Sequence, residues 1–196
     1  MELRRLPHLP TLPLLLLLLA FALLSACGGN GGNGAQARVT SPFTAEHARF
    51  FDDAVDLIRE PEALGGRWAE QWDEELRGRT GYADLIARVV VQTLRTDTDL
   101  EHRNTYHLVC RMNETLRGES PGEEVQVAVS EGSGGFETVA RNERRIVDAR
   151  FVLFLKWYAD DAGEVKSHWH LTPATRSMVE QVKQMIADAR RRAEEE

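Results

Sequence analysis

The stretch FVLFLKWY, residues 151–158, decides the fold, because Lys156 is its only charged residue. A continuous apolar and aromatic run of this length is typical of a central strand that is buried on both faces of a sheet. A short turn with two aspartates and Gly163 follows it, and residues 165–171 then form a further strand pattern. The sequence therefore predicts two consecutive strands joined by a short turn.

Three more strands are predicted upstream of this pair. Residues 86–94 are rich in valine, residues 105–112 alternate between apolar and polar side chains, and residues 125–129 place valine at every second position. Between the third and fourth strands, residues 136–146 are expected to form a helix or an irregular crossing. The sequence thus predicts about five strands with one crossing element among them.

Two helices are predicted before the first strand. Thr44 is a suitable N-cap for the first helix, and Pro61 would end it. Trp68, Trp72 and Leu76 recur every four residues and indicate a second, short helix that ends near Gly78. The apolar face of the first helix is expected to consist of Phe50, Phe51, Ala54, Val55 and Ile58.

A last helix is predicted at the C-terminus, where Thr172 and Pro173 suit the N-cap and the first helical position. Met178, Val182 and Ile186 recur at intervals of four on its apolar face. The whole pattern predicts the α+β class, with an antiparallel sheet of about five strands or a small OB-like barrel. Two N-terminal helices and one C-terminal helix would pack against it.

Trp68 and Trp72 have two possible interpretations. Aromatic side chains at helical spacing most often pack into the core of a domain. If they are exposed, they form an apolar stripe that can stack on carbohydrate or bind a partner. We therefore keep Trp68 and Trp72 as candidate partner-binding residues beside the core interpretation.

The first part of the chain is typical of a secretory signal. Arg4 and Arg5 supply a positive charge, and residues 14–24 form an uninterrupted apolar segment. This segment is shorter than the roughly 18–20 apolar residues that a membrane-spanning helix needs. The pattern therefore favours a signal peptide over a permanent transmembrane helix.

The end of this segment, Leu24-Ser25-Ala26-Cys27, resembles the lipobox of bacterial lipoproteins. The resemblance implies that the Cys27 thiol receives diacylglycerol and that a signal peptidase cuts between Ala26 and Cys27. It also implies that an acyl chain such as palmitate is added to the new amino group. Several acyl chains together give stable membrane anchoring. The alternative is an ordinary cleaved signal with an incidental cysteine.

The residues after Cys27 predict the destination and the domain organisation. Residue 28 is glycine, whereas the inner-membrane retention signal of Gram-negative lipoproteins is typically an aspartate there, so the outer membrane is favoured. The GGNGGNG stretch, residues 28–34, indicates a flexible tether, and residues 28–41 would span about 20 Å as a random coil. We predict a signal peptide over residues 1–26, lipidated Cys27 and its tether over 27–41, and a single α+β domain over 42–196.

The composition limits the kinds of partner. The chain has 31 acidic and 24 basic residues and a formal net charge of −7. Nucleic-acid binding needs clustered basic side chains, and a polybasic membrane-surface role needs the same excess, so both are disfavoured. The expected partners are the membrane, through the lipid on Cys27, and an envelope protein or cell-wall component.

Three histidines are candidate metal ligands. Alternation along residues 165–171 places Lys166, His168 and His170 on one face of their strand. Two imidazoles at this spacing can share a metal ion, and His107 on another strand could supply a third ligand. The alternative is that these histidines are ordinary surface residues beside the unfavourable charge of Lys166.

Cys110 is a candidate nucleophile. It could act with His107 or His168 as its base, since such partners need proximity in space rather than in sequence. Cys110 also belongs to an alternating apolar set in residues 105–112, which favours a buried position in the core. If Cys27 is lipidated, Cys110 has no cysteine partner within the chain.

Asp52, Asp53 and Asp56 are candidate acid and base residues, although clustered carboxylates also occur on the polar face of an ordinary helix. No Walker loop, Gly-x-Ser-x-Gly elbow or His-Glu-x-x-His motif is present in the sequence. We therefore predict no catalytic residue and no cofactor. The leading hypothesis is an envelope lipoprotein with a non-catalytic binding or structural domain; the alternatives are a metal-binding protein using His168 and His170, and a hydrolase.

Overall fold

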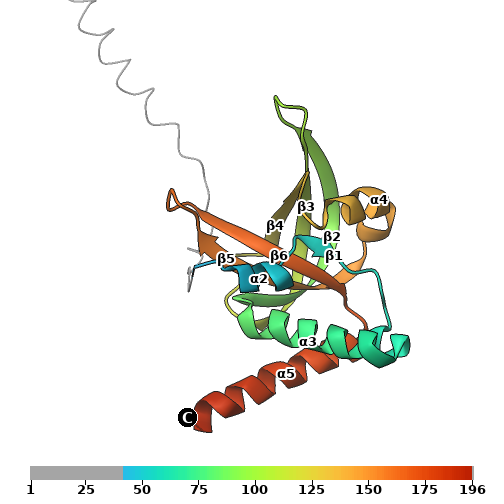
Figure 1. The fold of residues 1–196 in the computed structure, drawn as a ribbon, viewed down its shortest axis with the longest axis vertical. Coiled ribbons are helices and arrows are strands. Elements are labelled where there is room, and N and C mark those ends of the chain that lie inside the picture. The colour runs from blue at the N-terminus through green and yellow to red at the C-terminus, as the bar shows by residue number, and fades with distance from the viewer. Residues whose placement is uncertain (1–41, 196) are drawn as a thin grey trace, which may run out of the picture. The chain divides into compact units, whose positions relative to one another are not determined.

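The computed structural model describes residues 42–195, and the strand predicted from residues 151–158 is present there as β5. The predictions for residues 1–41, including the signal peptide, Cys27 and the tether, lie outside the described residues. In chain order, the elements seen in Figure 1 are α2 (Ala45–Phe50), β1 (Ala54–Val55), the 3-10 helix η2 (Pro61–Leu64), α3 (Gly66–Tyr82), β2 (Leu85–Thr98), β3 (Asn104–Arg117), β4 (Glu124–Ser130), α4 (Phe136–Ile146), β5 (Arg150–Ala159), β6 (Val165–Pro173) and α5 (Arg176–Glu195).

The described strands form one mixed sheet in the order β1-β6-β5-β2-β3-β4. Every neighbouring pair is antiparallel except β1, which runs parallel to β6. The sheet is strongly curled (Figure 1), and the indole Nε1 of Trp169 on β6 donates a hydrogen bond of 2.8 Å to the carbonyl of Ala128 on β4. The sheet is therefore a half-barrel whose two edges are β1 and β4.

The α+β class is confirmed, and each of the five predicted strands is present. The predicted strand number and the purely antiparallel pairing are wrong, because β1 adds a sixth strand that pairs in parallel with β6. A strand of two residues is too short to produce a periodic pattern that sequence reasoning can detect. The closed OB-like barrel is not formed either, since β1 and β4 end the hydrogen-bonded order of the sheet.

Both faces of β5 are buried, as its apolar sequence predicts. Phe151, Leu153 and Leu155 point into the curl of the sheet, where they pack with apolar residues of the other five strands and of α4. Val152 and Phe154 point to the outer face, where they pack under α2, α3 and α5. Because alternate residues of one strand enter two separate cores, β5 connects the inside of the half-barrel to its helical cover.

The helix predicted from Thr44 to Ile58 is much shorter than expected. Thr44 caps α2 as predicted, but the helix ends at Phe50. Asp53 then has a left-handed backbone, with φ of 55°, and its N–H donates to the carbonyl of Trp169 at 2.9 Å. The expected helical face was wrong beyond Phe50 because pairing with β6 supplies the backbone hydrogen bonds that a helix would otherwise supply.

The second helix is longer than predicted, since α3 continues through Gly78 to Tyr82. The ring of Phe50 packs against Gly78 so closely that a Cβ atom there would lie 2.2 Å from the ring. At the other end of the domain, Thr172 and Pro173 belong to β6 and do not begin α5 as predicted. Thr175, which directly precedes α5, caps the helix instead, because its hydroxyl accepts a hydrogen bond of 3.2 Å from the N–H of Met178.

The crossing between β4 and β5 is the helix α4, so the described part of the chain has four α-helices, one more than predicted. Val139 and Ile146 of α4 are fully buried in the core inside the half-barrel. Helices α3 and α5 lie side by side on the outer face (Figure 1). Across residues 42–195, no helix is both long and apolar enough to span a membrane.

Candidate functional site

The structure brings five sequence-predicted side chains together where β1 lies beside β6. We call Asp52, Asp53, Asp56, His168 and His170 the Asp–His cluster. At its centre the buried ring of His170 lies between two carboxylates, with Nδ1 2.7 Å from Oδ1 of Asp52 and Nε2 2.7 Å from Oδ2 of Asp56. A neutral imidazole carries one N–H, so only the imidazolium can donate to both carboxylates. The geometry therefore favours a positively charged His170.

The surroundings of His170 agree with this charge. Burial opposes the charged form of His170, and so does nearby Arg79, but hydrogen bonds to Asp52 and Asp56 outweigh them and raise the pKa of His170 above its ordinary value. Burial also opposes ionisation of Asp56. The hydrogen bond to His170, the charges of His170 and Arg79, and the Thr172 hydroxyl nevertheless lower the pKa of Asp56. Arg79 donates to Asp56 at 3.3 Å and Thr172 donates to it at 3.2 Å.

Asp53 supplies the second connection between the two strands. One of its oxygens lies 2.8 Å from Nδ1 of His168, and the other accepts the backbone N–H of Trp169 at 3.1 Å. The His168 ring is stacked on Tyr158, with ring centroids 5.0 Å apart, and lies 4.3 Å from the ring of Phe43. An aspartate–histidine pair can activate a nucleophile. Among residues 42–195, however, no serine or cysteine side chain is hydrogen-bonded to His168.

The remaining metal-ligand candidate lies elsewhere. His107 on β3 has its Nε2 3.2 Å from Oδ2 of Asp97 on β2, and Lys166 pairs with Asp160 in the β5–β6 turn. Within residues 42–195, no group of three or more His, Cys, Asp or Glu side chains is placed to hold a metal ion. The metal-binding hypothesis for His168, His170 and His107 thus gains no support from the described residues and stays a prediction.

The remaining candidate residues, Cys110, Trp72 and Trp68, differ in how far their side chains are buried. Cys110 is fully buried in the inner core, and burial raises the pKa of its thiol to about 12, so the thiol stays protonated at neutral pH. Trp72 is half-buried, packs against the outer core and lies under the guanidinium of Arg79. Trp68 is 67% exposed. Of the two tryptophans, only Trp68 remains available to a partner.

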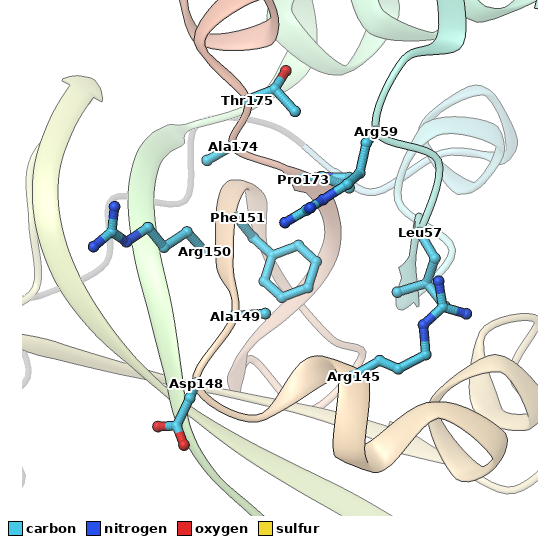
Figure 2. Close-up of a pocket in the computed structure, with 10 residues that line it drawn as sticks. All are labelled: Leu57, Arg59, Arg145, Asp148, Ala149, Arg150, Phe151, Pro173, Ala174 and Thr175. Atoms are coloured by element: carbon cyan, nitrogen blue, oxygen red, sulfur yellow. The ribbon is translucent and has the colours of Figure 1, made fainter.

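Sequence reasoning missed an open pocket of about 710 Å³, which Figure 2 shows in close-up. Its apolar lining consists of Leu57, Ala149, Phe151, Pro173 and Ala174. Its polar lining consists of Arg59, Arg145, Asp148, Arg150 and Thr175. We call this site the arginine pocket. It joins three segments of the chain that are far apart in sequence, which is why no local pattern indicated it.

Two of the arginines face the pocket. In Figure 2, Arg59 extends toward the ring of Phe151. Arg145 extends from the last turn of α4 toward Leu57. Among the described side chains, neither arginine forms an ion pair; Arg145 donates one hydrogen bond of 3.1 Å to the amide oxygen of Asn142. Guanidinium groups bind carboxylate and phosphate in a bidentate manner, so this pair of cations suits an anionic ligand.

The third arginine and the aspartate of the pocket point away from it (Figure 2). Asp148 has a left-handed backbone, with φ of 62°, and its N–H donates to the carbonyl of Val91 on β2 at 2.8 Å. The N–H of Val91 in turn donates to the carbonyl of Ala149 at 3.2 Å. These bonds hold the turn between α4 and β5 against β2. The Asp148 carboxylate is therefore directed away from Arg59 and Arg145 and leaves their charge uncompensated.

The Asp–His cluster positions one wall of the pocket. Asp56 directly precedes Leu57, and Thr172 directly precedes Pro173. The hydrogen bonds of Asp56 to His170 and Thr172, together with its backbone N–H to the carbonyl of Leu171 at 2.8 Å, hold these neighbouring residues side by side. We conclude that the Asp–His cluster is a structural support of the arginine pocket.

No family model matches the chain, and no curated protein matches it significantly.

Proposed function

We propose that this protein is a lipid-anchored protein of the bacterial cell envelope whose domain binds an anionic ligand in the arginine pocket without catalysing a reaction on it. The observation that carries the binding proposal is the pair Arg59 and Arg145, which reach the pocket without a carboxylate partner among the described side chains. Solvent alone can hydrate such cations, but a concave site concentrates their field on a bound anion.

The charge of the chain as a whole adds to this argument. With a formal net charge of −7, the protein as a whole repels anions. The arginines of the pocket provide a local attraction that offsets this repulsion at the binding site. The pocket volume of about 710 Å³ also lies in the range of small-molecule sites, which is roughly 300–1,000 Å³.

The non-catalytic part of the proposal is supported by the Asp–His cluster. Both ring nitrogens of His170 are occupied by carboxylates, and Asp53 is shared between His168 and a backbone N–H. Groups that satisfy one another in this way hold β1 in place and have little capacity left for a substrate. Cys110, the other candidate, is a protonated core thiol.

The envelope location is proposed from the sequence, with the outer membrane favoured by Gly28. Anchoring at Cys27 would leave residues 28–41 as a tether, so the arginine pocket could reach a ligand at some distance from the bilayer. The anchor and the pocket then have separate roles. The lipid fixes the protein to the membrane, and the pocket selects the ligand.

The anchor is tested by expressing the full chain in a Gram-negative host and separating the membranes by density. We expect the protein in the outer-membrane fraction, with mass spectrometry showing diacylglycerol on Cys27 and an acylated amino group. The Cys27→Ala variant should leave the membrane fraction or retain its signal peptide. A mature protein that starts elsewhere, without lipid, would contradict the anchor.

Binding is tested by native mass spectrometry of the full lipidated protein purified from those membranes. We expect a bound anion of defined mass in the unmodified protein and its loss in the Arg59→Gln/Arg145→Gln double variant. Arg144→Gln is the matched control, since Arg144 is an exposed neighbour that does not line the pocket. Equal ligand content in all three proteins would show that the pocket is not the binding site.

A further inference from the structure

We infer that the ligand of the arginine pocket is an amphipathic anion, with an alkyl or aryl group against the apolar wall and a carboxylate or phosphate group on Arg59 and Arg145. This inference rests on the proposed function, since it specifies the ligand of the same site. It adds the requirement for an apolar part, which the charge of the pocket alone does not imply.

The apolar wall carries this requirement. Leu57, Ala149 and Ala174 are half-buried side chains, and they line the pocket together with the buried side chain of Phe151. Half of the lining residues are therefore apolar. A ligand without an apolar part would leave this wall in water and gain nothing from it.

The exposure of the two arginines explains why charge alone would give the pocket little affinity for an anion. Arg59 and Arg145 are exposed side chains, and water screens ion pairs at exposed positions so that each contributes little to affinity. A lone phosphate would also fill only a small part of a pocket of about 710 Å³. Removal of apolar surface from water is not screened by salt, so it supplies the affinity that the two arginines lack.

The two parts of the site also fix the orientation of the ligand. In Figure 2, Arg59 approaches Phe151 and Arg145 approaches Leu57, so the guanidinium groups lie beside the apolar wall. A ligand whose anionic group is bonded directly to its apolar group satisfies both at once. A free amphipathic acid and the headgroup region of an anionic lipid share this chemistry.

The inference is tested by calorimetric titration of the full lipidated protein in phosphatidylcholine nanodiscs. The probes are hexyl phosphate, inorganic phosphate, hexanol and hexyltrimethylammonium. We expect hexyl phosphate to bind at least about tenfold more tightly than the other three probes, a difference set by combining the apolar contact with the charge. Arg59→Gln/Arg145→Gln should reduce hexyl phosphate binding to the level of hexanol, and Arg144→Gln should leave it unchanged.

A second variant separates the apolar requirement from the proposed function. Leu57→Ala should weaken the binding of hexyl phosphate and leave that of inorganic phosphate unchanged. If the two phosphates bind equally and both depend on Arg59 and Arg145, the inference is overturned while anion binding by the pocket stands. If no probe binds and the membrane-purified protein carries no ligand, the proposed function itself fails.

Nanodiscs that contain phosphatidylglycerol distinguish the two sources of the ligand. If a lipid headgroup occupies the pocket, these nanodiscs should weaken hexyl phosphate binding in the unmodified protein but not in the double arginine variant. If the ligand is a free acid, the affinity should be the same in both kinds of nanodisc. Either result, with the dependence on Arg59 and Arg145, supports the amphipathic anion.

Discussion

Nε2 of His170 lies 2.7 Å from Oδ2 of Asp56, and this contact in the interior ties β6 to the residue that follows β1. Asp56 is also the last residue before the segment that carries Leu57 and Arg59 into the arginine pocket. One pair, formed by the buried His170 and the half-buried Asp56, thus connects the stability of the sheet edge to the geometry of the proposed binding site.

The stability of the domain should depend on the protonation of His170. Its pKa is raised in the folded protein, so its stabilising effect is complete below the ordinary pKa of about 6.5 and is lost as the pH rises through the folded-state pKa. We expect the free energy of unfolding to decrease as the pH rises above about 6.5. Urea denaturation at a series of pH values measures this.

The His170→Gln variant should lack this decrease, whereas His102→Gln, at an exposed position in the β2–β3 turn, should retain it. A free energy of unfolding that does not change between neutral and alkaline pH in the unmodified protein would show that His170 is not charged.

Replacement of Asp56 by asparagine should destabilise the domain strongly. The change removes the carboxylate charge beside the buried side chains of His170 and Arg79, and leaving a buried charge without its partner costs about 3 kcal/mol. The midpoint of urea denaturation, with a constant denaturant slope, measures the loss. Asp97→Asn, which removes the exposed partner of His107, is the control and should leave the midpoint nearly unchanged. Equal effects of the two variants would argue against a buried network.

Gly78 should not tolerate a methyl group. Alanine there would place Cβ 2.2 Å from the Phe50 ring, and overpacking of this kind costs about 1–3 kcal/mol. Gly81 lies in the same helix, and no atom outside the neighbouring helix backbone lies within 4 Å of the position that a Cβ would take there. Gly81→Ala should therefore stabilise the domain by up to about 1 kcal/mol. Thermal unfolding of both variants measures the difference. Two stabilised proteins would show that Phe50 does not pack on α3.

The Cys110 thiol should react slowly with alkylating reagents in the folded protein. It is fully buried, and its pKa of about 12 leaves very little thiolate at neutral pH. In a Cys27→Ala background, we expect labelling only at the rate at which the domain opens, and rapid labelling in denaturant. Rapid labelling under native conditions would revive the hypothesis of a thiol nucleophile.

The strand pattern could be predicted from sequence, and the candidate site could be predicted only in part. The strands of residues 86–94 and 151–158 are visible because their apolar side chains follow the geometry of a strand. The sequence predicts a helix face for Asp52, Asp53 and Asp56, since the spacing of Phe50 and Phe51 with later apolar residues fits a helix as well. Only the hydrogen bonds from this segment to β6 show that it is not helical.

The sequence by itself determined the α+β class, the five long strands and the expectation of a lipid anchor, because each depends on a local pattern of side chains. Only the tertiary structure decided the position of β1, the pairing of Asp53 with His168 and the arginine pocket. Asp53 and His168 are 115 residues apart, and the cations of the pocket come from the segment after β1 and from α4. Contacts between distant segments follow from the burial of shared apolar surface, which no local spacing encodes.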